Sequence, residues 1–519
     1  MEDEEERFRA KIDPWSHEVR PHGSSSTGRP LKSWTSAAVF ASFVVIILCG
    51  SAVSWLDIFI FPGVSLSQMI PAKRGHRELP QKMEFPLNCT NSSTMPQTCP
   101  ANYPKKHEPK ESYTVACPEY FRWIHEDLRP WKSTGITREM MERTKHIAHF
   151  RLVIANGNAY IEHYKRPFQT RDVGTIWGIL QLLRLYPGKV PDLELMFYCN
   201  DRPVIMKSHY QGPNAALPPP LFHYCRDETS LDILFPDWSF WGWHEVNIRT
   251  WANTYQAIKK KAKEIEWKDR MPYAYWKGNP DVSPKRQDLM TCNATDEYDW
   301  NARLYVQNWA AESSHGYKES RLEDQCIHRY KIFVEGQAWS VSDKYILACD
   351  STTLMIEPVY HDFFLRGMIP VEHYWPIRLN NKCRDIKFAV EWGNNHIKEA
   401  QAIGESGSRF MEENLKMKYV YDYMLHLLVE YAKLLKFKPE VPAGATKYCA
   451  EGMACPVSGL FRTNMEDSMV KSPSDSLPCT LPPPYDPREL QDFMERKRNN
   501  TRLLEMWEAE YWNNLNKKH

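Results

Sequence analysis

Asp201 is the residue whose type and position best fit a catalytic role. The run LELMFYCNDRP predicts a buried strand that ends abruptly in polar residues, and Asp201 stands at that end. In an open α/β sheet, ligands bind beyond the carboxyl ends of the strands. A carboxylate in that position could accept the proton of an attacking hydroxyl as a general base. The alternative is a structural role, in which Asp201 caps a helix or pairs with Arg202.

A glycine loop that follows a second apolar run could hold a phosphate. Lys277 and Gly278 come directly after YAYW. Glycine lets a phosphate approach the backbone closely, and the lysine supplies positive charge. The alternative is an ordinary strand-to-helix turn. Neither a G-x-x-x-x-G-K-S/T loop nor a G-x-G-x-x-G fingerprint is present in the sequence.

A third segment runs from Gly336 to Lys344, after the apolar run KIFVE. Ser340 or Ser342 could cap a helix that carries Lys344 in its first turns. The free N–H groups and dipole of a helix N-terminus attract phosphate. The alternative is that Ser340 is only a cap and Lys344 is solvated.

The aromatic segment DILFPDWSFWGW, residues 232–243, could bind a sugar. The indole of Trp238 could stack on a sugar face, and Asp237 could bond its hydroxyls. The alternative is a buried aromatic cluster with a capping aspartate. The chain has no Asp-x-Asp metal motif, so we expect no metal cofactor, and Lys, Arg and helix N-termini would have to neutralise a diphosphate.

Alternating strands and helices must position these residues. Hairpin, helix and strand patterns follow one another from about Cys117, and strand–helix alternation favours parallel α/β sheets. The Asn156-Gly157 pair predicts a tight hairpin turn. The chain has 519 residues, which is enough for two such domains with a cleft between them. The formal net charge of +1 gives no electrostatic reason to expect a nucleic-acid partner.

One apolar segment predicts a membrane anchor. Residues 35–61 carry a single charge, Asp57, and a bilayer core needs about 20 apolar residues of helix. A cleaved signal peptide fits less well, because a long polar stretch precedes the segment. Twelve cysteines follow it, an even number that suits disulfides in an oxidising lumen. Four N-x-S/T sequons, at Asn88, Asn91, Asn293 and Asn499, agree with a lumenal position.

An ordered set of segments resembles the Rumi-type protein O-glucosyltransferases of glycosyltransferase family 90. The residues within these segments resemble those of the family's plant branch. The resemblance covers roughly residues 117–437. Its landmarks are CPEYFRWIHEDLRPW, ELMFYCNDRP, DILFPDWSFW, MPYAYWKGNPDVSPKRQDL, LEDQCIHRYKIFVEG, SDKYILACDSTTLMI and GESGSRFMEENL.

The resemblance implies a GT-B fold, with two Rossmann-like domains facing across a cleft. It also implies a UDP-sugar donor, no required metal, inversion at the anomeric carbon and Asp201 as the catalytic base. Two arginines of the family's pattern are missing, since Pro280 and Ser342 occupy their places. Lys277, Arg286 and Lys344 are left to supply positive charge to the diphosphate.

We therefore expect a type II, single-pass protein of the Golgi or endoplasmic reticulum membrane with a lumenal catalytic part. The predicted divisions are a cytosolic tail (1–34), the anchor (35–61), a stem (62–115), an acceptor-side half (116–265), a UDP-sugar-side half (266–437) and a Pro-rich tail with a final helix (438–519). The expected reaction is transfer of glucose or xylose to a hydroxyl of a secretory-pathway protein. The alternatives are transfer to a cell-wall polysaccharide or another glycan, and an inactive carbohydrate-binding protein. A glycoside hydrolase would need two opposed carboxylates, and only one convincing candidate is present.

Overall fold

The computed structural model describes residues 84–89, 104–110, 114–212 and 216–517. The predicted cytosolic tail and anchor, and most of the predicted stem, lie outside the described residues. Within the described part, no helix combines the length and apolar character needed to cross a bilayer.

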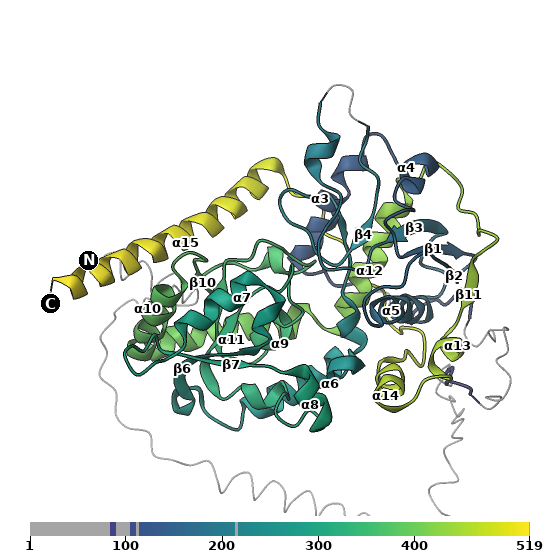
Figure 1. The fold of residues 1–519 in the computed structure, drawn as a ribbon. Coiled ribbons are helices and arrows are strands. Elements are labelled where there is room, and N and C mark those ends of the chain that lie inside the picture. Colours follow the sequence, from purple (N-terminus) through teal and green to yellow (C-terminus); the bar gives the residue numbers. More distant parts are fainter. Residues whose placement is uncertain (1–83, 90–103, 111–113, 213–215, 518–519) are drawn as a thin grey trace, which may run out of the picture. The chain divides into compact units, whose positions relative to one another are not determined.

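Two sheets organise the described part of the chain (Figure 1). The first has the order β11-β2-β1-β3-β4-β5 and the second the order β10-β9-β8-β6-β7. The strands are β1 (Phe150–Ala155), β2 (Asn158–His163), β3 (Leu193–Phe197), β4 (Phe222–His223), β5 (Ile233–Leu234), β6 (Met271–Gly278), β7 (Ala302–Val306), β8 (His328–Phe333), β9 (Thr352–Ile356), β10 (Trp375–Ile377) and β11 (Thr446–Tyr448).

The first sheet is mixed, which corrects the expectation of two parallel Rossmann-like sheets. β3, β4 and β5 are parallel, but β1 pairs antiparallel with both β2 and β3. The cause is local: Asn156 and Gly157 both have positive φ, and this two-residue turn folds β2 back onto β1 in register, as predicted. The tail strand β11 then adds antiparallel to β2.

The second sheet is parallel throughout, as predicted for a strand–helix alternation. Its buried strands pack with α10 and α11 in a core of their own. The α-helices of the described residues are α3 (Trp123–Asp127), α4 (Arg138–Glu142), α5 (Arg171–Leu185), α6 (Trp251–Ala262), α7 (Pro284–Leu289), α8 (Trp309–Ser314), α9 (Asp343–Leu347), α10 (Lys382–Asn395), α11 (Ile397–Asn414), α12 (Met417–Ala432), α13 (Ala450–Ala454), α14 (Gly459–Ser468) and α15 (Pro487–Asn516).

The tail is tied back to the start of the folded chain. Disulfides join Cys89 to Cys455 and Cys117 to Cys479, which are 366 and 362 residues apart in sequence. Two further disulfides, Cys292–Cys383 and Cys326–Cys349, lie in the part that holds the second sheet. The expectation of disulfides is confirmed, although Cys199 and Cys225 are buried free thiols.

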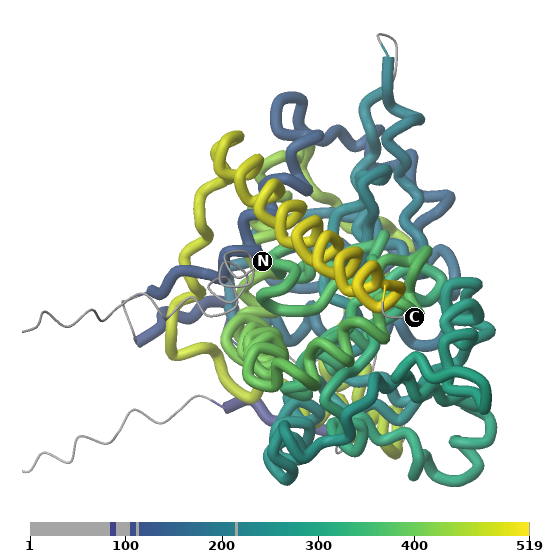
Figure 2. The backbone as a smooth tube through the Cα atoms, turned by 90° about the vertical axis from the view of Figure 1, so that its left-hand side faces the viewer, coloured from purple at the N-terminus to yellow at the C-terminus, as the bar shows by residue number. Residues whose placement is uncertain are grey.

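The final helix α15 contacts both parts of the structure, and Figure 2 shows it in yellow, running across the other elements. Near its start Glu489 pairs with Arg122 at 2.5 Å, and further along Arg496 pairs with Glu372 at 2.6 Å. Near its end the buried Glu508 pairs with Arg378, which also holds Asp385. Two buried carboxyls thus share one guanidinium.

The proximity of the Glu508 and Asp385 carboxyl groups predicts that the stability of the fold depends on pH. Burial and the neighbouring Asp385 raise the pKa of Glu508 from 4.5 to about 8. A carboxyl with a higher pKa in the folded than in the unfolded chain binds more protons when folded, so stability falls as the pH rises from about 4.5 to about 8. We expect Glu508→Gln to reduce this loss, measured as the thermal unfolding midpoint across the same pH range. The exposed Glu510→Gln, on the same helix, should leave the pH dependence unchanged. Equal slopes for wild type and Glu508→Gln would contradict the assignment.

Candidate active site

The second sheet has a topological switch point between β6 and β8. Numbered along the chain, its five strands have the spatial order 2-1-3-4-5, so the chain leaves the two central strands in opposite directions. Ligands of doubly wound folds bind in the crevice outside such a point. Lys277 and Gly278 end β6, and Glu335 and Gly336 follow β8. The two phosphate-binding segments predicted from the sequence therefore flank the switch point.

Arg286, on the short helix α7, joins the segments at this point. Its Nε donates to the carbonyl of Glu335 at 3.0 Å, Nη1 to the carbonyl of Asn279 at 3.3 Å and Nη2 to Ser340 Oγ at 3.3 Å. A Cβ at Gly336 would lie 3.7 Å from Nη2, in van der Waals contact with the guanidinium. The two glycine-containing loops and Ser340 thus converge on one guanidinium.

The positive charge of Arg286 is not neutralised by a carboxylate. Burial lowers its pKa to about 10, and no ion pair with an acid forms in the described part of the chain. A buried charge without a counter-ion is costly unless it is solvated or paired. An incoming anion such as a diphosphate would relieve that cost.

The ammonium group of Lys277 already has partners within the chain. Its ammonium lies 3.4 Å from Glu312 Oε1 on α8 and donates to the backbone carbonyl of Glu319 at 2.5 Å. The structure therefore ties Lys277 to the α8 segment, and its predicted contact with a donor phosphate stays a prediction.

The predicted helix after Gly336 is short. α9 has five residues, and although Ser342 occupies its N-cap position, its side chain makes no capping bond. Ser340 Oγ and Ser342 Oγ lie 2.8 Å apart, so the two hydroxyls form one polar pair beside Arg286. So short a helix offers little dipole for an anion.

Lys344 forms a buried ion pair with Asp237. The two side chains are 0% and 2% exposed, and Nζ lies 3.0 Å from Oδ2. Burial by itself would lower the pKa of the ammonium, but Asp237, with Tyr345 and Asp343, raises it. Asp237 also accepts hydrogen bonds from the amide and hydroxyl of Ser239, as a cap of the 3-10 turn that follows. This pair links the segment after β8 to the segment after β5.

Trp238 lies inside an aromatic cluster. Its ring is 2% exposed and packs edge-to-face on Tyr224, Trp243 and Trp339. The structure leaves no open indole face for the predicted sugar contact. The cluster instead lies between the two sheets, because Trp339 follows β8 and Tyr224 follows β4.

Asp201 lies four residues beyond β3, at the carboxyl edge of the first sheet. Its side chain is 40% exposed, and Oδ1 accepts a hydrogen bond from Arg171 Nη1 at 3.1 Å. The next residue, Arg202, donates to the backbone carbonyl and side-chain oxygen of Gln337 at 3.2 and 3.3 Å. Asp201 is therefore held beside the Gly336 loop, close to the switch point.

Sequence reasoning missed Arg171 and Gln337. Arg171 is the first residue of α5, where the helix dipole disfavours a positive charge. That mismatch was the available signal that the arginine has another task. Gln337 makes its contact across the two parts of the structure, and nothing in the spacing of the sequence indicates it.

Potential metal ligands gather once in the described residues, at Cys117, His426 and Cys479. The two sulfurs are joined in a disulfide, so this group cannot hold an ion through them.

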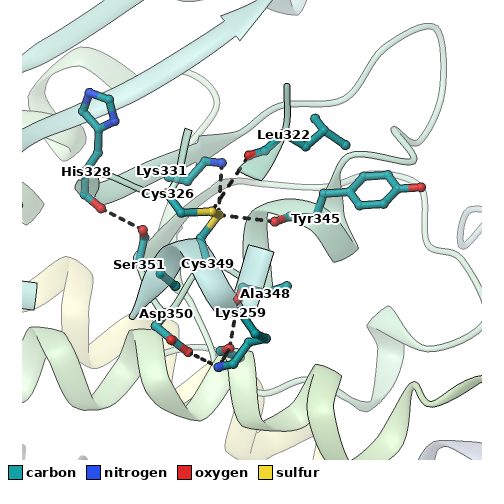
Figure 3. The surroundings of a disulfide bond; sticks show 12 residues. Lys259, Leu322, Cys326, His328, Lys331, Tyr345, Ala348, Cys349, Asp350 and Ser351 are labelled. Atoms are coloured by element: carbon teal, nitrogen blue, oxygen red, sulfur yellow. Dashed lines mark hydrogen bonds and ion pairs between the residues drawn. A yellow bond between two sulfur atoms is a disulfide. The ribbon is translucent and has the colours of Figure 1, made fainter. Parts of the chain in front are cut away.

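The disulfide Cys326–Cys349 encloses the segment that carries half of this site (Figure 3). β8, the Gly336 loop and α9 all lie between its two cysteines. Buried beside it, Lys331 points its ammonium at Cys349 Sγ, at 3.4 Å, and desolvation lowers the pKa of Lys331 to about 7. Ser351 donates to the carbonyl of His328, which closes the same unit.

Comparison with known proteins identifies the family of the chain. The model of glycosyl transferase family 90 matches residues 112–508, which contain both sheets and α15 up to Glu508. The chain belongs to this family. The resemblance to its Rumi-type members, stated from the sequence, is confirmed. An O-glucosyltransferase rumi homolog from Aedes aegypti is 24% identical over 64% of this chain and 82% of its own length. Protein O-glucosyltransferase 1 from Homo sapiens is 27% identical over 64% and 84%.

The Lys344–Asp237 pair predicts a stability defect. Lys344→Met would leave Asp237 buried without its partner, which costs about 3–5 kcal/mol. We expect a large drop in the denaturant midpoint of Lys344→Met, and a smaller drop when Asp237→Asn is combined with it. If Lys344→Met unfolds at the wild-type midpoint, the pair does not stabilise the junction between the sheets.

Proposed function

We propose that the chain is an inverting glycosyltransferase that moves a sugar from a UDP-sugar to a hydroxyl of a secretory-pathway protein. The observation that carries this proposal is the Arg202–Gln337 contact, which places the exposed carboxylate of Asp201 beside the switch point of the parallel sheet. The printed names of the relatives, O-glucosyltransferases of proteins, support a protein acceptor and glucose as the first donor to test. Xylose is the second.

The proposed reaction is one displacement. Asp201 removes the proton of the acceptor hydroxyl, whose oxygen forms a bond to the anomeric carbon of the sugar. The bond from that carbon to the diphosphate breaks, and UDP leaves with the electron pair. Attack from the face opposite the leaving group inverts the anomeric configuration. Arg286 and the Ser340–Ser342 hydroxyl pair stabilise the charge that develops on the diphosphate. We propose that no metal is required, since the chain lacks an Asp-x-Asp motif.

Each of the two sheets would bind one of the two substrates of the proposed reaction. In a GT-B arrangement the first sheet would face the acceptor and the second would bind UDP. Residues 35–61 would anchor the enzyme in the Golgi or endoplasmic reticulum membrane as a type II protein. The disulfides support an oxidising lumen for the folded part.

Asp201→Asn tests the proposed base. The variant keeps the size and one acceptor oxygen of the side chain but cannot take a proton, so transfer should fall by roughly 10²–10⁴-fold. Labelled UDP-glucose and UDP-xylose are incubated with the purified chain and with protein or glycan acceptors. Asp192→Asn is the matched control, because Asp192 lies at the amino end of the same strand and holds the amide of Asn156. Full activity of Asp201→Asn would disprove the mechanism, and transfer to glycans alone would overturn the proposed acceptor.

Arg286→Gln tests the diphosphate site. Loss of a charge-assisted hydrogen bond costs about 1.5–3 kcal/mol, so the affinity for UDP should fall roughly 10- to 100-fold. Isothermal titration with UDP measures this directly. Arg303→Gln is the control, because the guanidinium of Arg303 is already paired with Asp299 at 2.8 Å. Unchanged UDP affinity in Arg286→Gln would remove Arg286 from the site.

A further inference from the structure

Arg171 occupies a position that is unfavourable for an arginine. It is the first residue of α5, it is buried, and its charge lies at the positive end of the helix dipole. Its Nε is buried and makes no hydrogen bond within the described residues. Helix formation does not require a cation here, so its remaining contacts must explain its position.

Those contacts hold the Asp201 loop at two points. Nη1 donates to the carbonyl of Cys199 at 3.2 Å and to Asp201 Oδ1 at 3.1 Å. No hydrogen bond engages Oδ2 of Asp201 within the part of the chain that the structure describes. One carboxylate oxygen is therefore fixed, and the other is open for a proton.

The guanidinium also lies over two aromatic rings. Its Cζ is 4.5 Å from the ring centre of Trp238 and 5.2 Å from that of Phe168. Arginine stacks well on aromatic faces, and such contacts stabilise its charge. Trp238 is buried, whereas Phe168 is 62% exposed.

A rigid turn presents Phe168. Gln169 adopts φ of 57°, a strained value for a residue other than glycine, and its side chain accepts a hydrogen bond from Trp243 Nε1 at 2.9 Å. The amide and hydroxyl of Thr170 both donate to Glu245 Oε1 at 2.9 Å. These bonds keep the exposed ring over the guanidinium.

The contacts of Arg171 remain in place when Asp201 accepts a proton. A carboxylate that accepts a proton loses its charge, and an arginine paired only with it would then be left unpaired. Here the carbonyl of Cys199 and the two ring faces keep the guanidinium in place. The carboxyl group can gain and lose a proton without a rearrangement of its support.

We propose that Arg171 is the positioning residue of this enzyme: it fixes Oδ1 of Asp201 so that Oδ2 faces the acceptor hydroxyl, with Phe168 as the outer support of its guanidinium. This inference rests on the proposed function, in which Asp201 is the base. A base that is held within a narrow range of geometry removes a proton more efficiently than a mobile one.

Chemical rescue of Arg171→Ala tests the proposal on the full chain. The readout is release of UDP and labelled sugar from UDP-glucose and UDP-xylose, with water as acceptor. We expect kcat to fall at least tenfold while KM for the donor stays near that of wild type. Added methylguanidinium should restore part of kcat, and methylammonium, which has the same charge but no planar fork, should not. Arg166→Ala, an exposed arginine of the same loop, is the control for lost surface charge.

The outcomes separate the two proposals. Wild-type kcat in Arg171→Ala, or a loss of kcat that methylguanidinium does not restore, overturns the positioning role. Full activity in Asp201→Asn disproves the proposed mechanism, in which Asp201 is the base. The absence of UDP release from wild-type protein with either donor, when protein acceptors are added, overturns the proposed function itself. If Arg171→Ala does not fold, Arg171→Lys replaces it, because lysine keeps the charge but cannot reproduce the planar guanidinium. Wild-type kcat in Arg171→Lys then overturns the role, and a reduced kcat at unchanged KM supports it.

Discussion

The buried pair between Lys344 and Asp237 is the interaction on which the rest of the site depends. It joins the segment that follows β8 to the segment that follows β5, at the carboxyl edges of the two sheets. A charge pair with 0% and 2% exposure tolerates little displacement, because each partner would otherwise be desolvated alone. Arg286 with Ser340, and Arg202 with Gln337, are weaker contacts that lie beside this one. Their geometry follows from the fixed relation between the two segments.

Lys344 and Arg286 have different roles in the site, which explains why one is a lysine and the other an arginine. Lys344 has a carboxylate partner and stabilises the junction, whereas Arg286 has carbonyl and hydroxyl partners and keeps its charge available. Lysine gives a compact point charge suited to one buried partner, and arginine gives a fork that several oxygens can hold. Ser342, where the resemblance implies an arginine, is consistent with this division, since a second guanidinium beside Arg286 would repel it.

The sequence predicted the local elements well and the contacts between them less well. The Asn156-Gly157 hairpin, the strand before Asp201 and the parallel second sheet follow from turn chemistry and hydrophobic runs, which act over a few residues. The edge strand β11 of the first sheet comes from nearly 300 residues further along the chain than its partner β2, and no local pattern predicts that pairing. For the same reason the burial of Lys344 and Trp238, and the role of Arg171, could not be read from spacing. Each depends on partners that only the tertiary fold brings together.

The two longest disulfide connections have a consequence for biosynthesis. Cys117 cannot meet Cys479, and β2 cannot receive β11 at its edge, until the tail of the chain has been made. During translation the first sheet therefore lacks the edge strand β11 and the disulfide Cys117–Cys479. Its apolar faces stay uncovered until most of the chain has been synthesised. Folding that relies on contacts so distant in sequence is slow and exposes aggregation-prone surface. We infer that this protein folds late, as a whole, and that truncations that remove residues 446–519 impair the first half of the molecule as much as the second.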